Sequence, residues 1–127
     1  MSFTTFVDHL LMAAEDDWVG VWELPWLATS VGGASSPEEV MELSLKAIRK
    51  ALVDGLVEVG DVTELGFQPW GMLPDEACRR IEREWRRFPN GPRLGDISCW
   101  FNLTGKGRQH LAMKMHKKGN ADRRKPF

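Results

Sequence analysis

The stretch Ser36–Gly60 constrains the fold more than any other part of this chain. It opens with a helix start signal, in which Ser36 is a natural N-cap, Pro37 fits the first helical position and Glu39 completes a capping box. Apolar residues then recur at helical spacing, at Met41, Leu45, Ile48 and Leu52. Gly55 suits the left-handed position that ends a helix, and residues 56–59 alternate like a half-buried strand. The sequence therefore predicts a long helix followed directly by a strand, with the other elements packed around it.

Similar patterns predict four further helices and a second strand. The helices are expected over residues 4–16, 22–30, 75–88 and 104–116, and the strand over residues 97–103. In the short helix at 22–30, we expect Trp22, Trp26 and Leu27 to point inward. The first helix is expected to have an apolar face of Phe6 or Val7, Leu10, Leu11 and Ala14, and the helix at 75–88 one of Cys78, Ile81, Trp85 and Phe88. Thr104 is expected to cap the last helix. Residues 61–74 contain Gly and Pro at four positions and are expected to form a loop.

The chain of 127 residues is long enough for one domain with its own core. We expect a single domain over residues 1–116, with residues 61–94 as an insertion. Residues 117–127 carry five basic side chains and little to bury, which favours a disordered tail.

Charge is divided unevenly along the chain, although the net charge is only −1. Residues 1–74 contain 12 acidic and 3 basic side chains, which gives −9. Residues 75–127 contain 6 acidic and 14 basic side chains, which gives +8. Such asymmetry favours a charged partner, although the two halves could also neutralise each other across the fold.

The acidic half also contains tryptophans, which suggests a protein-binding face. Aromatic anchors ringed by carboxylates suit a basic protein partner, whereas the structural alternative is ordinary solubility and a Trp-rich core. The predicted partner-binding residues are Glu15, Asp16, Asp17, Trp18, Trp22, Glu38, Glu39 and Glu42. Small cytosolic immunity proteins that neutralise a nuclease toxin use such faces, and size and charge are the basis of that analogy.

The basic half has an arginine-rich helix with three interpretations. It is a solvated helix face, a phosphate-contacting element, or a partner for the acidic half within one molecule or between two copies of a homodimer. The residues available for nucleic-acid binding are Lys46, Arg49, Lys50, Arg79, Arg83, Arg86 and Arg87.

Motifs for catalysis are absent from the sequence. It has no Gly-rich phosphate loop, GxSxG or HExxH pattern, and neither Cys78 nor Cys99 belongs to a CxxC pair. We therefore expect no enzyme activity, no metal and no cofactor. The chain shows neither a secretory signal nor an apolar run of the roughly 20 residues that span a membrane, so a cytoplasmic location without membrane contact is expected.

Two stretches resemble winged-helix regulators of the bacterial PadR and MarR types. Residues 54–60, DGLVEVG, resemble the end of the third helix and the strand after it. Residues 99–111, CWFNLTGKGRQHL, resemble the returning strand and the following helix. With the upstream helices, the resemblance spans roughly residues 4–60 and 95–115. It implies a DNA-binding regulator whose third helix enters the major groove.

The chain departs from that pattern at two places. The wing hairpin is replaced by residues 61–94, and the helix that corresponds to the recognition helix opens with Glu38, Glu39 and Glu42, which phosphates would repel. We therefore expect an α+β, mainly α fold, with a winged-helix-like three-helix core, a short antiparallel β-hairpin and an inserted helix. The leading functional hypothesis is a non-enzymatic protein-binding module of regulatory or toxin-neutralising type, and a DNA-binding transcriptional regulator is the alternative.

Overall fold

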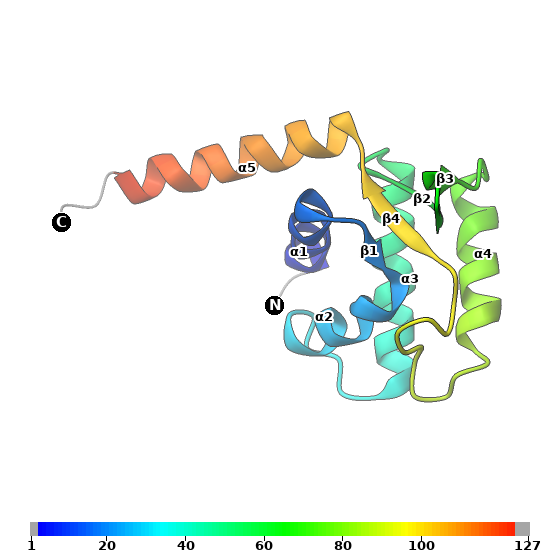
Figure 1. Cartoon of the computed structure of the whole chain (residues 1–127). Coiled ribbons are helices and arrows are strands. Elements are labelled where there is room, and N and C mark those ends of the chain that lie inside the picture. The colour runs from blue at the N-terminus through cyan, green and yellow to red at the C-terminus, as the bar shows by residue number, and fades with distance from the viewer. Residues whose placement is uncertain (1–2, 124–127) are drawn as a thin grey trace.

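The chain folds into five α-helices and one four-stranded antiparallel sheet (Figure 1). The computed structural model describes the backbone of residues 3–123 and the side chains of residues 5–114, and these counts refer to that part. The elements in chain order are α1 (Phe3–Asp16), β1 (Val19–Gly20), a 3-10 helix (Val21–Glu23), α2 (Leu24–Ser30), α3 (Pro37–Val53), β2 (Val57–Thr63), β3 (Gly66–Pro69), α4 (Pro74–Trp85), β4 (Trp100–Leu103) and α5 (Gly105–Arg123). The expected α+β class is confirmed.

Strand order in the sheet is β1-β4-β2-β3, so the last strand of the chain lies between the first two. The centre of β4 is fixed by Phe101, which pairs with Val19 on one side and Val59 on the other. The chain therefore returns across about 40 residues to complete the sheet. The predicted strand at 97–103 is shorter than expected, because only residues 100–103 join the ladder.

Helix α3 begins and ends where the sequence predicts. The Ser36 hydroxyl accepts a hydrogen bond from the Glu39 backbone N–H at 3.2 Å, as an N-cap does. The other half of the predicted capping box differs, because the Glu39 carboxylate accepts from the Ser35 hydroxyl at 3.0 Å and not from the Ser36 backbone N–H. At the other end, Gly55 has a φ of +71°, the left-handed conformation expected after the helix.

The core lies between the sheet and helices α1 and α3. On α1, the predicted apolar face is confirmed, since all five of its members are buried: Phe6, Val7, Leu10, Leu11 and Ala14. On α3, Met41, Ala47 and Ile48 are buried, and from the sheet Phe101 joins them. In Figure 1, α3 lies behind the strands β1 and β4, and no described helix lies in front of them. One face of the sheet is therefore not covered by helices.

The prediction that Trp26 points inward is wrong. Helix α2 begins at Leu24 and not at Trp22, because a 3-10 turn precedes it. The buried stripe therefore passes through Leu24, Leu27 and Ala28, and Trp26 is 70% exposed.

The predicted loop at 61–74 is also wrong, because a β-hairpin occupies its first part. Strand β2 continues to Thr63 and pairs with β3 from Gly60↔Pro69 to Thr63↔Gly66. At the turn, the Thr63 hydroxyl accepts from the Leu65 backbone N–H at 3.1 Å, and Gly66 takes a φ of +94°. Of the four residues interpreted as breakers, Gly66 follows the tight turn, Pro69 ends β3 and Pro74 begins α4.

Helix α4 lies alongside α3 in the opposite direction. Near its start, the Asp75 carboxylate accepts from Arg49 Nε at 2.9 Å, and near its end Trp85 and Met41 line the same cavity. Of the apolar face expected at Cys78, Ile81, Trp85 and Phe88, Ile81 and Trp85 are buried and the other two are half-buried, and Ala77 is buried beside them. The helix ends at Trp85, three residues earlier than predicted.

Helix α5 begins beside Leu56, which follows the end of α3, contacts α1, and then extends beyond the body of the domain (Figure 1). The Thr104 hydroxyl accepts from the Gly107 backbone N–H at 2.9 Å, which confirms the predicted cap. The backbone of the helix continues to Arg123, through residues 117–123, for which the sequence predicts a disordered tail. Residues 124–127 lie outside the described part. No described helix is long and apolar enough to cross a membrane.

Gly107 gives a test of this packing. A Cβ on Gly107 would overlap the Leu56 carbonyl oxygen, whereas a Cβ on Gly105 meets nothing within 4 Å. We expect Gly107→Ala to lower the free energy of unfolding by about 1–3 kcal/mol, the usual cost of overpacking. The matched variant Gly105→Ala should lose none, as measured by urea denaturation. Equal effects of the two substitutions would contradict the close approach of α5 to β2.

Candidate functional site

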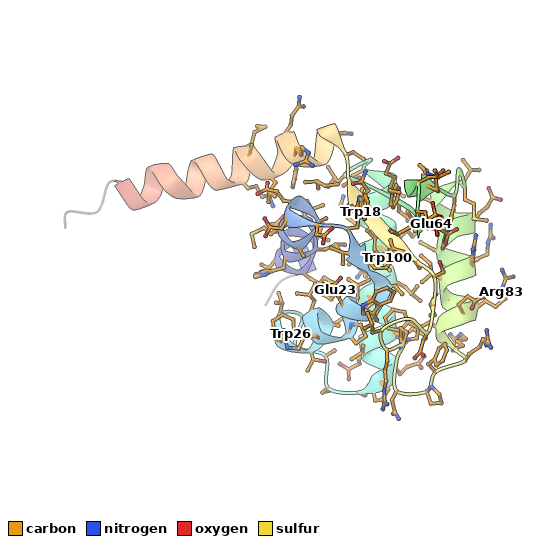
Figure 2. The ribbon with its side chains drawn as sticks, viewed as in Figure 1. Trp18, Glu23, Trp26, Glu64, Arg83 and Trp100 are labelled. Carbon is orange, nitrogen blue, oxygen red and sulfur yellow. The ribbon has the colours of Figure 1, made fainter. Side chains whose placement is uncertain are left out.

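The face of the sheet that no helix covers carries the most distinctive group of side chains. Along β4 and the start of β2, buried residues alternate with half-buried residues that face outward, namely Glu58, Trp100 and Asn102. Trp18 and Trp100 lie on this outer side of the sheet in Figure 2. We define the open face by four aromatic and three acidic residues: Trp18, Trp22, Phe67, Trp100, Asp17, Glu23 and Glu58.

Two glycines flank Trp100 in the sheet. Gly20 pairs with it from β1 and Gly60 pairs with it from β2, so no side chain rises on either side of the indole. The Trp22 ring fills the space above Gly20, where a Cβ would overlap it. Trp22 and Trp100 meet edge to face, with ring centroids 4.7 Å apart at 85°, which is a favoured aromatic geometry. Because Gly20 has no side chain, the Trp22 ring can occupy this space and contact the Trp100 ring.

The β2–β3 hairpin supplies a second aromatic contact. A Cβ on Gly60 would overlap the Gln68 carbonyl oxygen, so glycine allows the two strands to approach closely and bend there. The tip of the hairpin reaches Trp18, whose ring centroid lies 6.3 Å from that of Phe67. Because Trp18 precedes β1 and Phe67 belongs to β3, this contact joins the two edges of the sheet.

Each carboxylate of the open face is held by a hydrogen bond. Asn102 Nδ2 donates to Glu58 Oε1 at 2.9 Å across the β4–β2 pair. The Gly20 backbone N–H donates to Glu23 Oε2 at 2.7 Å, and the Trp18 backbone N–H donates to Asp17 Oδ1 at 2.7 Å. The negative charges are therefore oriented before any partner arrives.

The predicted partner-binding residues fall into two groups. Asp17, Trp18 and Trp22 belong to the open face, and Glu15 and Asp16 are exposed next to it at the end of α1. The second group, Glu38, Glu39 and Glu42, is exposed on the first two turns of α3. These turns lie at the lower end of the domain as drawn in Figure 1, away from the link between α1 and β1. The structure does not bring the two groups together.

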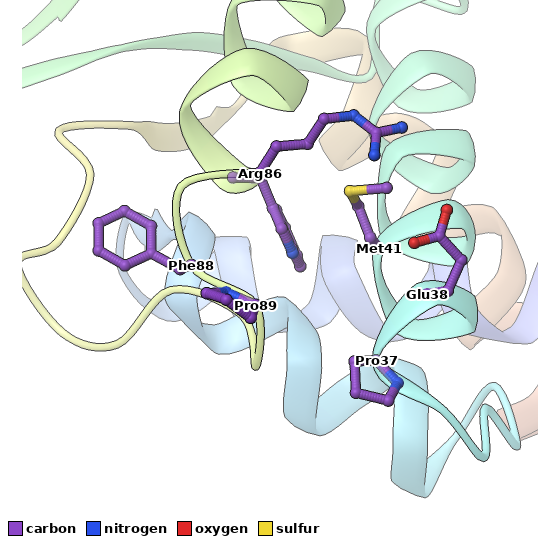
Figure 3. A pocket seen from close by; sticks show the side chains of 7 residues that line it. Pro37, Glu38, Met41, Arg86, Phe88 and Pro89 are labelled. Carbon is purple, nitrogen blue, oxygen red and sulfur yellow. The ribbon is translucent and has the colours of Figure 1, made fainter.

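Glu38 lies beside a small cavity at that end of the domain. With Arg86 it flanks a cavity of about 120 Å³ between the start of α3 and the end of α4 (Figure 3). Met41 and Trp85 form its apolar part. The cavity is small and bears one charge of each sign, so it does not extend the acidic surface.

The cations of the nucleic-acid alternative lie on the outside of α3 and α4, and all of them are exposed: Lys46, Arg49, Lys50, Arg79, Arg83, Arg86 and Arg87. Four of them have carboxylate partners at 2.9–3.4 Å, in the pairs Arg49–Asp75, Lys50–Asp54, Arg86–Glu82 and Arg87–Glu84. Such exposed pairs add little stability, but they lower the positive charge offered to a phosphate.

The local patterns do not identify Glu58, Phe67 and Trp100 as site residues, or Asn102 as the residue that orients Glu58. For Trp100 and Asn102, however, the sequence contains an indication. Both occupy the polar side of the alternating strand at 97–103, which predicts that the large aromatic side chain of Trp100 faces outward. The pairing of Glu58 with Asn102 depends on strand register, which the local pattern did not give.

Nothing in the described residues groups three or more His, Cys, Asp and Glu side chains that could hold a metal ion. Burial raises the pKa of the Cys99 thiol, and it raises that of the half-buried Cys78 as well. Both side chains therefore remain thiols at neutral pH, the form that reacts poorly as a nucleophile.

Comparison of the chain with models of protein families, with curated proteins and with solved structures gave no match.

Gly20 gives a test of the aromatic arrangement. We expect Gly20→Ala to displace the Trp22 ring, because the new methyl group occupies its place. In protein labelled with 5-fluorotryptophan, the ¹⁹F resonances of Trp22 and Trp100 should shift, while that of buried Trp85 should not. Unchanged Trp22 and Trp100 resonances would show that the ring does not rest on Gly20.

Proposed function

We propose that this protein is a non-enzymatic protein-binding module, of regulatory or toxin-neutralising type, that binds a basic partner through its open face. The observation that carries the proposal is the concentration of four aromatic rings and three oriented carboxylates on a sheet face that no helix covers. Aromatic residues dominate the energetics of protein interfaces, and complementary charge directs the choice of partner.

The distribution of ion pairs supports a basic partner. Within the described residues, Asp8 is the one carboxylate of residues 1–74 that meets a cation of residues 75–127. It accepts from Lys114 at 2.9 Å and lies 3.7 Å from His110 Nε2. The other ion pairs join neighbours on α3 or α4, or join α3 to α4. The acidic half is therefore not neutralised by direct pairing with the basic half.

Topology supports a winged-helix type of core, which we propose as the fold relationship. Helices α1, α2 and α3 precede the strand β2, and β4 returns between β1 and β2, as the resemblance implies for the returning strand. The end of β2, the strand β3 and the helix α4, which lie within residues 61–94, are then the inserted part. This relationship concerns architecture, and it does not assign a function by itself.

A DNA-binding regulator is the second candidate, and it is favoured by the group of Lys46, Arg49 and Arg79 between α3 and α4, although Asp75 and Glu82 lie in the same group. Two features weigh against it. Helix α4 lies along α3, which would have to enter the major groove, and the first turns of α3 expose Glu38, Glu39 and Glu42. We therefore place DNA binding below protein binding.

The protein-binding proposal is tested by recovery of partners from the native cell extract. We expect a basic protein to be retained by the unaltered chain. Trp100→Ala should weaken its binding at least 30-fold, since truncating a central interface residue costs about 2 kcal/mol or more. Isothermal titration calorimetry with the purified partner measures the change.

Two matched variants separate the open face from the other acidic surfaces. The pair Glu38→Gln and Glu42→Gln removes the charge that the sequence analysis assigned to the partner, and Glu76→Gln removes an exposed charge on α4. Retention of binding in both is the expected result. Loss of binding with the α3 pair and not with Trp100→Ala would place the interface on α3 and overturn the proposal.

The DNA alternative predicts a steep salt dependence. Each phosphate neutralised contributes a slope of about −0.9 to the plot of log affinity against log salt. If α4 contacted phosphates, replacing Arg83, Arg86 and Arg87 by Ala should flatten this slope by nearly three units. We expect a change smaller than one unit in fluorescence anisotropy with random duplex DNA. A nanomolar, sequence-selective complex that is lost on Arg49→Ala would reverse the ranking of the two functions.

A further inference from the structure

We propose that the open face receives an arginine side chain of the partner, whose guanidinium lies over a tryptophan ring and against the Glu58 carboxylate. The inference rests on the proposed function and adds the chemical group that is recognised.

Strand register places the carboxylate among the rings. Glu58 of β2 pairs with Asn102 of β4. Because Val19 of β1 pairs with Phe101, the residue before it, Trp18, lies next to Asn102 on the other side. The neighbouring row consists of Gly60, Trp100 and Gly20. Glu58 therefore lies one row from Trp100 on the same face, and Asn102 stands between Glu58 and the position of Trp18.

The Glu58 carboxylate is oriented but not saturated by its hydrogen bond. Asn102 donates to one of its oxygens, whereas an ionised carboxylate offers about four acceptor sites. Glu58 is also only half-buried, so its charge is partly shielded from water and still reachable. A cation brought to this position meets both a fixed negative charge and the negative faces of aromatic rings.

The protein already makes the proposed contact elsewhere. The Arg80 guanidinium carbon lies 3.8 Å from the centre of the Trp70 ring, within the range of a cation–π interaction. Trp70 and Arg80 also line a cavity with Glu84. Guanidinium, indole and carboxylate thus occur together at one place in the fold, and the open face offers the latter two without the first.

Flat rings favour arginine over lysine. A guanidinium is planar, stacks on an aromatic face and donates several N–H groups in one plane to a carboxylate, whereas an ammonium is a compact and strongly hydrated charge. Trp100 is only half-buried, so part of its ring is open to such a planar group, while the Trp22 ring fills the space over Gly20 and the Gln68 carbonyl fills that over Gly60. We therefore expect an arginine-containing peptide to bind more tightly than the equivalent lysine peptide.

The test uses the full chain with two probes, acetylated hexa-arginine amide and acetylated hexa-lysine amide. Glu58→Gln keeps the size of the side chain and an acceptor for Asn102, and removes only the charge. We expect it to weaken hexa-arginine binding about tenfold in isothermal titration calorimetry, while the control Glu76→Gln changes it less than twofold. Circular dichroism verifies that both variants are folded.

A measurement on the unaltered sequence keeps the proposal testable if a variant does not fold. In 5-fluorotryptophan protein, hexa-arginine should shift the resonances of Trp100 and Trp18 and leave buried Trp85 unchanged. Equal affinity for the two peptides, or equal weakening by Glu58→Gln and Glu76→Gln, would overturn the arginine assignment.

These outcomes are distinguishable from failure of the proposed function. If Trp100→Ala abolishes binding of the recovered partner while Glu58→Gln does not alter it, the open face is the interface but no arginine occupies it. If Trp100→Ala leaves partner binding intact, the proposed function fails as well.

Discussion

The structure depends on the insertion of β4 between β1 and β2. With only two residues, β1 has no other partner in the sheet, and β2 would otherwise have β3 alone. Bringing β4 back over about 40 residues costs loop-closure entropy. Three features offset that cost: burial of Phe101 and Leu103, the backbone hydrogen bond from Thr104 N–H to the Leu56 carbonyl at 3.0 Å, and that from Val21 N–H to the Cys99 carbonyl at 3.0 Å. The same pairing sets the register that places Trp100, Asn102 and Glu58 on one face.

Three glycines adjust how closely neighbouring elements approach. Gly107 allows α5 to pass over Leu56, Gly60 allows β3 to bend against β2, and Gly20 gives the Trp22 ring its place. In each case a Cβ would overlap another atom of the fold, so the requirement is spatial and does not come from backbone dihedral angles. The first position supports the core, whereas Gly20 and Gly60 shape the open face. The packing of the core and the shape of the candidate site therefore both depend on glycines at positions where a side chain would not fit.

Local sequence patterns predicted helices well, because capping and apolar periodicity are read within one segment. Ser36, Gly55 and Thr104 behave as predicted, and so does the apolar face of α1. Features that depend on distant partners were not predictable in this way. The pattern of residues 61–74 indicates a loop where the hairpin at Gly66 forms. The periodicity of residues 22–30 places Trp26 in the core, but the 3-10 turn before α2 changes the phase of the helix and leaves Trp26 exposed. Of the candidate site, Trp18, Trp22 and Asp17 were identified from composition, but Glu58 and Trp100 required the strand register.

The position of α4 connects the fold to the choice of function. In a winged-helix arrangement the outer surface of the third helix is the one offered to DNA. Here the apolar side of α4, with Ala77, Ile81 and Trp85, is buried against the body alongside α3, and Asp75 is paired with Arg49. Removing α4 to expose α3 would return that apolar surface to water, at about 25 cal/mol for each Å² exposed. No described helix covers the open face. Because a preorganised surface lowers the cost of association, this difference is a reason that we propose the sheet face and not α3 as the binding surface.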